Sequence, residues 1–100
     1  MAGEITLADA RTLDPIWIDA RSIREHENNR IPDSIHFDES DWSTGLFALM
    51  ETWLERPRPI VIYCGSETCG TSKRIAKRLR ESMTDAEIYS LKGAWTAWQK

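Results

Sequence analysis

One stretch constrains the fold more than any other. A short apolar run, a small polar loop and a basic amphipathic segment follow one another at residues 60–79, IVIYCGSETCGTSKRIAKRL. Residues 60–63 have no polar face, which is typical of a central strand in a parallel sheet covered on both sides. Beyond the loop, apolar side chains recur at helical spacing, which predicts a helix with Thr71 or Ser72 as its N-cap. The loop then lies outside the carboxyl end of the strand, where open α/β sheets bind ligands.

Cys64 directly follows the predicted strand and precedes the loop. Unpaired loop amides and the positive end of the helix dipole favour an anion at this point, and such surroundings lower the pKa of a thiol. We therefore predict a thiolate nucleophile at Cys64. The alternative is a structural cysteine that ends the strand, since free cysteine is among the residues most often found inside proteins.

Length, charge and composition narrow the class of protein. One hundred residues predict a single domain over residues 1–100, and a net charge of −3 gives no general attraction to nucleic acid or anionic membranes. The N-terminal segment lacks the basic start and apolar core of a signal peptide, and no apolar run reaches membrane-spanning length. With only two cysteines, these features predict a reduced cytoplasmic protein that binds neither nucleic acid nor membrane.

Neither a metal nor a nucleotide is expected. His26 and His36 lie far in sequence from the cysteines, and the chain has no C-x-x-C or H-x-x-x-H spacing. It also has no glycine-rich phosphate loop. We therefore expect no cofactor.

The rest of the chain alternates short apolar runs with helical patterns. Strands are expected at residue 5 and at residues 16–18, 34–37, 60–63 and 87–91. Helices are expected at residues 7–13, 41–56, 72–83 and 94–99. This order predicts a three-layer α/β domain with a mostly parallel central sheet of about five strands flanked by helices.

Local signals place some of these boundaries. Thr6 and Asp9 form a capping-box-like start for the first helix. Gly45 interrupts the longest helical pattern at an expected cost of about 1 kcal/mol. The polar stretch at residues 22–29 is expected to leave the second strand and turn at Asn28 and Asn29.

Three segments, in their order along the chain, resemble the signatures of the rhodanese-like domain family. They are IDARSIREHENNRIPDSIHF, the strand, loop and helix around Cys64, and IYSLKGAWTAW. In the first segment the matching positions are Asp19, Arg21, Glu25, Ile31, Pro32 and Ile35. The resemblance covers residues 5–98 and implies the rhodanese-like fold, which belongs to the same three-layer α/β class.

Several positions depart from the family pattern. Arg30 stands where the family usually has histidine, Asn29 and Asp33 where it has glycine, and His26 where it has an aromatic residue. In the third segment, Ala94 replaces the second glycine of a pair.

The resemblance implies a sulfurtransferase in which Cys64 carries a sulfane sulfur as a persulfide. The donor would be thiosulfate or a persulfide, and the acceptor a thiol or another nucleophile, either small or on a protein. The loop amides would cradle the anionic sulfur. The loop residues of this cradle are Gly65, Ser66, Glu67, Thr68, Gly70 and Thr71.

The loop lacks the arginine that family members commonly place just before the helix, and it contains Glu67. An arginine offers a bidentate fork to an oxyanion, so we expect thiosulfate to be a poor donor. Arg21, Arg24 and Lys92 each follow another strand and could supply a cation. For Arg21 the resemblance instead implies a structural ion pair with Asp19 or Glu25, both close to it in sequence.

Cys69 is a second thiol in the same loop. It could attack a persulfide on Cys64, release sulfide and leave a Cys64–Cys69 disulfide, or it could protect Cys64 from over-oxidation. Two alternatives to sulfur transfer therefore stay open: a thiol-disulfide redox protein using both cysteines, and a non-catalytic rhodanese-like binding module. Cys69 could also be a small loop residue without a redox role.

Other conspicuous residues have structural interpretations. Most of the tryptophans lie at helical spacing, which is typical of core packing. The basic side chains between residues 73 and 80 are expected to form a solvated helix surface, with docking of an acidic protein partner as the alternative. The sequence gives no indication of the oligomeric state.

Overall fold

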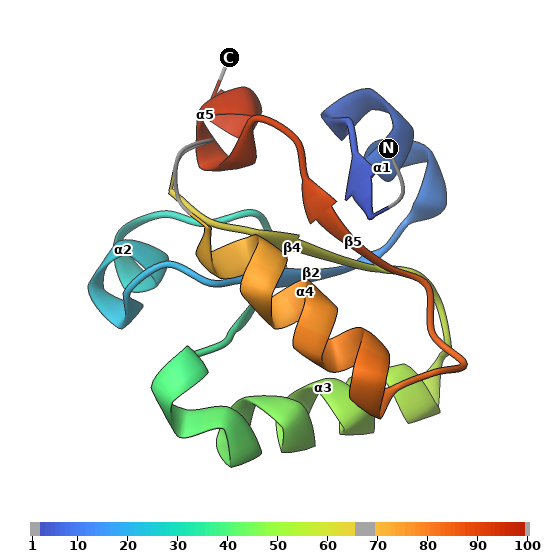
Figure 1. Cartoon of the computed structure of the whole chain (residues 1–100). Coiled ribbons are helices and arrows are strands. Elements are labelled where there is room, and N and C mark those ends of the chain that lie inside the picture. The colour runs from blue at the N-terminus through green and yellow to red at the C-terminus, as the bar shows by residue number, and fades with distance from the viewer. Residues whose placement is uncertain (1–2, 66–69, 100) are drawn as a thin grey trace.

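The computed structural model describes residues 3–65 and 70–99, which form a five-stranded sheet with helices on both faces (Figure 1). The strands are β1 Glu4–Ile5, β2 Ile16–Asp19, β3 Ile35–His36, β4 Ile60–Tyr63 and β5 Ile88–Leu91. Their order across the sheet is β1-β5-β4-β2-β3, and every neighbouring pair is parallel. The predicted α/β class and its parallel sheet are confirmed.

The helices are α1 Leu7–Leu13, α2 Ile23–Asn28, α3 Trp42–Glu55, α4 Thr71–Ser82 and α5 Ala94–Gln99, with a 3₁₀ turn η1 at Glu39–Asp41. Side chains of alternating strand residues point to opposite faces and form two cores. Ile60 and Ile62 pack with α3 and α4, whereas Val61 and Tyr63 pack with α1 and α5. These two cores give the three layers visible in Figure 1.

The central strand β4 is fully enclosed. All four of its residues are buried, and β4 pairs with β2 on one side and β5 on the other. An apolar run without a polar face requires this position, because both of its faces must be covered. Cys64, immediately after β4, therefore lies at the carboxyl end of the middle of the sheet.

Local capping explains where α1 begins and ends. The Thr6 side chain accepts a hydrogen bond from the Asp9 N–H at 3.2 Å, as predicted. Asp14 ends the helix in the left-handed conformation with φ 46°, which short polar residues tolerate better than most.

Gly45 is buried inside α3, against the ring of Phe37. A Cβ at position 45 would lie 2.8 Å from that ring, closer than packed carbon atoms approach. The glycine that weakens the helical pattern therefore allows α3 to approach the sheet.

Two local predictions were wrong. Residues 23–28, expected as a polar connection, form α2, because Ser22 and Glu25 make a full capping box, and the helix ends at Asn28 with Asn29 as its C-cap. The N-cap of α4 is Gly70, so Thr71 and Ser72 lie inside the helix. The hydroxyl of Ser72 is instead 3.4 Å from the sulfur of Cys64.

Candidate functional site

The candidate site is centred on Cys64, which β4 and α4 position. Its Sγ lies 3.4 Å from the Oγ of Ser72, the second residue of α4. Its carbonyl oxygen accepts a 2.9 Å hydrogen bond from the N–H of Trp95 in α5. Cys64 is only 1% exposed. Elements on both faces of the sheet therefore fix the backbone and the sulfur of this residue.

The predicted loop residues are only partly described. Gly65, Gly70 and Thr71 belong to the described residues, and Gly70 and Thr71 form the start of α4. The other predicted loop positions and the possible resolving thiol, namely Ser66, Glu67, Thr68 and Cys69, lie outside the described residues.

A buried charge cluster lies at the carboxyl end of β2. The Oδ1 of Asp19 accepts from the N–H of Arg21 at 2.9 Å and from its Nε at 3.0 Å, and Oδ2 accepts from the guanidinium at 2.8 Å. The Nδ1 of His26 lies 2.9 Å from the same Oδ2. The Asp19 and Arg21 side chains are 0% and 4% exposed. Arg21 thus makes the ion pair that the family resemblance implies, and its partner is Asp19.

These contacts shift the pKa values of both partners. Burial raises the pKa of the Asp19 carboxyl, but hydrogen bonds from Arg21 and His26 outweigh burial and hold this pKa below its ordinary value of 3.8. Burial lowers the pKa of Arg21, and the bond to Asp19 outweighs that effect and raises it. Both groups are therefore charged at neutral pH.

Arg21 also ties this cluster to the residues around Cys64. Its guanidinium lies 4.1 Å from the ring centroid of Trp95 and 5.5 Å from that of Tyr63, and these two rings stack with centroids 5.9 Å apart. Tyr63 precedes Cys64, and Trp95 donates to the Cys64 carbonyl. The cation–π contacts of Arg21 therefore help to hold in place Tyr63 and Trp95, both of which contact the Cys64 backbone.

Glu25, the third residue predicted to support the site, lies apart from this ion pair. Its N–H donates to the Ser22 hydroxyl at 3.2 Å, and its carboxylate accepts from the Ser22 N–H at 3.3 Å. Glu25 therefore caps α2 and does not pair with Arg21.

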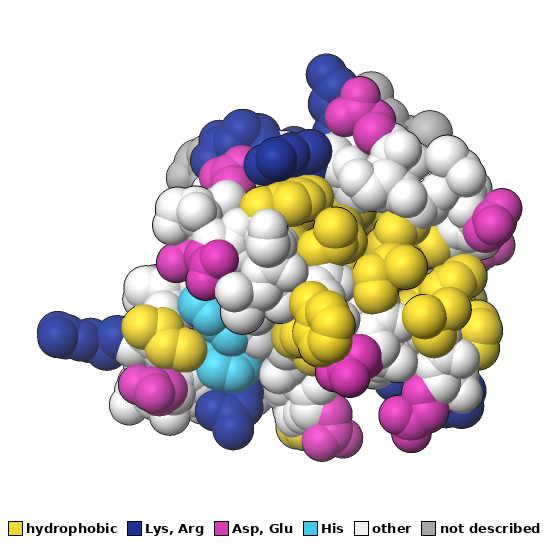
Figure 2. Space-filling view, turned by 90° about the horizontal axis from the view of Figure 1, so that it is seen from below, with side chains coloured by type: hydrophobic (Ala, Val, Ile, Leu, Met, Phe, Trp, Pro, Cys, Tyr) yellow, Lys and Arg dark blue, Asp and Glu magenta, His cyan; other side chains and the backbone are white. Residues whose placement is uncertain are grey.

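A pocket of about 410 Å³ opens next to the site, between the carboxyl ends of β2 and β3 and the start of α4. Thr71 lines it and is the neighbour of Ser72, which contacts Cys64. Asp38 and Glu39 line it as well, and Arg74 binds both Glu39 and the Thr71 hydroxyl. His36 also lines it, and its ring lies 5.4 Å from that of His26, so the two histidines are neighbours in Figure 2.

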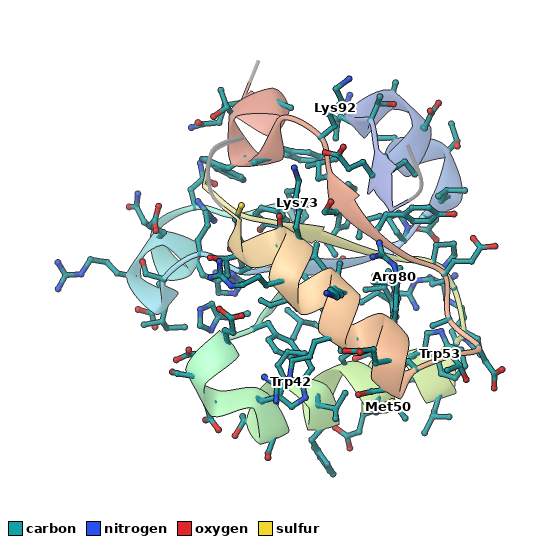
Figure 3. The ribbon with its side chains drawn as sticks, viewed as in Figure 1. Trp42, Met50, Trp53, Lys73, Arg80 and Lys92 are labelled. Atoms are coloured by element: carbon teal, nitrogen blue, oxygen red, sulfur yellow. The ribbon has the colours of Figure 1, made fainter. Side chains whose placement is uncertain are left out.

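The cations near this pocket are already engaged. Arg74 makes two hydrogen bonds of 3.1 and 3.2 Å with the carboxylate of Glu39, and Arg21 pairs with Asp19. Arg24 and Lys92 are exposed and do not line the pocket. Lys73 lies 3.7 Å from Glu4, and Figure 3 shows it on α4 and Lys92 beyond the end of β5. Among the described residues, therefore, no unpaired cation lines this pocket.

The sequence did not identify two hydroxyl groups at the site, those of Tyr63 and Ser72, because their partners lie elsewhere in the chain. The Tyr63 hydroxyl donates to the Ser34 hydroxyl at 3.1 Å and accepts from the Ile31 N–H at 3.2 Å. Burial raises the pKa of the Tyr63 phenol. The hydrogen bond with Ser34 lowers this pKa by a smaller amount than burial raises it, and the negative charge of Asp19 raises it further. The contact between Ser72 and Cys64 could have been suspected from a serine at a buried helix position.

Within residues 3–65 and 70–99, no three His, Cys, Asp or Glu side chains are grouped to hold a metal ion. In the same residues, no helix has the length and apolar character to span a bilayer.

Comparisons with known proteins agree with this fold. A family model described as a rhodanese-like domain matches residues 5–100. Among solved structures, the BH2092 protein from Bacillus halodurans aligns with a TM-score of 0.72 at 17% identity, covering 98% of this chain and 72% of that one. The N-terminal domain of a Clostridium difficile 630 protein, whose name refers to ATP/GTP binding, aligns with a TM-score of 0.65 at 18% identity and 95% coverage of both chains. No curated protein sequence matches the chain significantly. At such identities the structural likeness shows the fold alone.

Proposed function

As this chain belongs to the rhodanese-like domain family, we propose that it is a sulfurtransferase that carries a sulfane sulfur as a persulfide on Cys64. One observation carries the proposal. Cys64 lies at the carboxyl end of the central strand, with its sulfur 3.4 Å from the Ser72 hydroxyl in the first turn of α4. This is the crevice in which open α/β sheets bind ligands, and helix N-termini favour anions.

The proposed reaction has two displacement steps at sulfur. The Cys64 thiolate attacks the outer sulfur of a donor persulfide, RS–SH. The new Cys64 S–S bond forms as the donor S–S bond breaks, and the leaving thiolate RS⁻ takes the electron pair. An acceptor thiolate then attacks the outer sulfur of the Cys64 persulfide. The S–S bond on Cys64 breaks, the acceptor becomes the new persulfide, and Cys64 takes the electron pair and returns to a thiolate. No external oxidant or reductant is consumed.

The Ser72 hydroxyl suits both states of the sulfur. A hydroxyl can rotate to accept from a thiol or to donate to a thiolate, because it has one donor and two acceptor positions. Donation to an anionic sulfur is a charge-assisted hydrogen bond, which is stronger than a neutral one. Ser72 therefore stabilises the thiolate and need not move to do so.

We propose a persulfide, not thiosulfate, as the preferred donor, and a cytoplasmic thiol as the acceptor. Asp38 and Glu39 line the pocket beside Thr71, and the nearby guanidinium of Arg74 already binds Glu39. Thiosulfate carries two negative charges and would face carboxylates without an unpaired cation. A persulfide has a smaller charge, and the rest of the donor can be neutral or cationic.

The test is the intact mass of fully reduced protein after incubation with a polysulfide, followed by peptide mapping. We expect the mass to increase by one sulfur atom, and peptide mapping to place this atom on Cys64. The increase should be absent in Cys64→Ser and present in Cys69→Ser. The loaded protein should then transfer this sulfur to a small thiol. Thiosulfate should load the protein at least tenfold more slowly than the polysulfide does.

Two other outcomes would replace the proposal. Loss of two hydrogens, mapped to a bridge between Cys64 and Cys69, would indicate a thiol-disulfide redox protein. An unchanged mass in folded protein would indicate a non-catalytic binding module. Sulfur transfer retained in Cys64→Ser would remove Cys64 from the chemistry altogether.

A further inference from the structure

The outer surface of α3 carries exposed apolar side chains next to those that pack in the core. Phe47 is 67% exposed and Leu54 is 65% exposed, the two highest values among the large exposed hydrophobic residues of the described chain. Met50 lies between them on the same helix and is half-buried. We call these three residues the α3 seam. Figure 2 views the molecule from below and shows hydrophobic side chains gathered on that face.

The α3 seam borders the face that α3 buries, and its half-buried middle residue, Met50, also packs against the core. The helix packs against the sheet with Gly45, Leu49 and the half-buried Trp53. The seam residues follow one another at intervals of three and four, so they form a stripe that continues the buried face onto the surface. Single exposed apolar residues are ordinary, but a stripe with this spacing is how a helix packs against another helix. Met50 and Trp53 can be followed on α3 in Figure 3.

The charges around the α3 seam are negative. Residues 38–55 contain five carboxylates and neither lysine nor arginine. Glu51 and Glu55 lie on α3 next to the seam, at four-residue intervals from Phe47, and within the described residues neither forms an ion pair. Figure 2 shows acidic side chains around the apolar ones.

Cations at both ends of α3 are engaged by other groups. Arg56 lies 3.2 Å from Asp14, and the guanidinium of Arg78 lies 4.0 Å from the ring centroid of Trp42. Glu39, before the helix, is held by Arg74. The middle of α3 therefore keeps an apolar stripe with uncompensated negative charge along its polar side.

We propose that the α3 seam docks an amphipathic helix of another protein, with apolar residues that pack on Phe47, Met50 and Leu54 and basic residues that pair with Glu51 and Glu55. Apolar contact gives most of the affinity in such a pairing, and charge complementarity gives orientation and selects the partner. The proposal is independent of sulfur transfer, because it rests on a helix that does not contact Cys64.

A second copy of this chain is a poorer occupant. Antiparallel pairing of two α3 helices about Met50 would bring Glu51 close to its own counterpart, with no cation on either helix. Like charges at that distance oppose association. The seam also exposes apolar area on the order of 300 Å², against roughly 800 Å² per partner in a stable interface. A single partner helix fits this area better than a dimer of whole proteins.

The probe is a synthetic helical peptide of about 18 residues, with leucines at intervals of three and four and lysines beside them. A matched peptide replaces the lysines with glutamates. Each is titrated into the isotope-labelled full chain, and amide shifts are followed by NMR. We expect saturable shifts confined to α3 with the lysine peptide, and at least tenfold weaker binding of the glutamate peptide.

Variants of the protein make the test specific. Phe47→Ser combined with Leu54→Ser should weaken binding of the lysine peptide at least tenfold. Glu51→Gln combined with Glu55→Gln should weaken it severalfold and reduce its salt dependence. Ile23→Ser is the control, because Ile23 is also exposed, at 53%, but lies on α2. All these side chains are on the surface, so the variants should fold.

Several results would overturn the proposal. Equal binding of both peptides, no saturable binding, or shifts outside α3 would remove the basic-helix partner. A concentration-dependent dimer in sedimentation, dissolved by the Phe47 and Leu54 substitutions, would assign the seam to a second copy. Binding to phosphatidylcholine vesicles, lost in the same variant, would assign it to a lipid surface.

Discussion

Replacing Asp19 with asparagine should destabilise the protein strongly, because it removes one partner of a buried ion pair. The Asp19 carboxylate accepts three hydrogen bonds from Arg21, and its side chain is fully buried. Asparagine has nearly the same shape but no charge, so the Arg21 guanidinium, 4% exposed, would stay buried without a counter-charge. Breaking such a pair typically costs about 3–5 kcal/mol, out of a total stability of about 5–15 kcal/mol.

Urea unfolding followed by tryptophan fluorescence measures this cost. Asp14→Asn is the matched control, because Asp14 pairs with Arg56 at 3.2 Å, but both side chains are more than 60% exposed. Exposed pairs contribute less than about 1 kcal/mol. A loss below about 1 kcal/mol for Asp19→Asn, or equal losses for the two variants, would contradict our account of the pair.

A double variant separates the ion pair from simple loss of packing. If Arg21 is also replaced with methionine, no buried charge remains, and the double variant should be more stable than Asp19→Asn alone by at least about 1 kcal/mol. This comparison remains informative if the single variant is only marginally folded, because a stabilising osmolyte can be added to all samples equally. Additive losses would show that the two side chains are not coupled.

The pH dependence of this effect follows from the lowered pKa of Asp19. A carboxyl whose pKa is lower in the folded state than in the unfolded state stabilises the fold above the unfolded pKa. That contribution disappears as the pH falls through the folded pKa. The difference in stability between wild type and Asp19→Asn should therefore be full at pH 6 and shrink below the ordinary value of 3.8. A difference that does not change between pH 6 and pH 3 would contradict the assigned cause.

Two further substitutions test the packing of the sheet. Gly45→Ala should destabilise the protein by about 1 kcal/mol in urea unfolding, because the clash with the Phe37 ring, about 1–3 kcal/mol, exceeds the gain of about 1 kcal/mol in helix propensity. A stabilised variant would show that the ring can move aside. Arg80→Met should speed hydrogen exchange at β1 and β5, because the guanidinium donates to the carbonyls of Ile88 and Gly3 at 2.8 and 3.2 Å. Unchanged exchange would show that this bridge does not hold the strands together.

How much of the fold the sequence could predict depended on burial. The run at residues 60–63 and the stripes of α3 and α4 are strongly patterned because they face the core, and all three were predicted. The helix α2 has no buried residue, so it has no apolar periodicity, and the segment was expected to be a polar connection. Its only local signal is the capping box of Ser22 and Glu25. A search for S-x-x-E would have found this helix.

The glycine positions of the family show a second limit. Of the three residues that replace family glycines, Asp33 and Ala94 have positive φ, at 66° and 51°, whereas Asn29 is extended. Sequence comparison identified the substitutions but could not tell whether the backbone had changed. In this chain the backbone is left-handed at both Asp33 and Ala94. Aspartate tolerates it through its short polar side chain, whereas alanine costs about 1–2 kcal/mol there. Ala94 is buried at the start of α5, so the surrounding packing must compensate for this strain.

The chemistry at Cys64 could be anticipated from its place after a buried strand, but its surroundings could not. Tyr63, Trp95 and Arg21 come from three separated segments, and their contacts depend on the assembled fold. The stack of these side chains holds the residue before Cys64 and the donor to its carbonyl oxygen. Loss of the Asp19 charge should therefore slow sulfur loading in protein that is still folded, because Arg21 would hold Tyr63 and Trp95 less firmly and Cys64 would be less well positioned. The thiol itself is unchanged in that variant, so its loading should still reach one sulfur per chain. A lower final stoichiometry in folded protein would show instead that the charge cluster takes part in the sulfur chemistry.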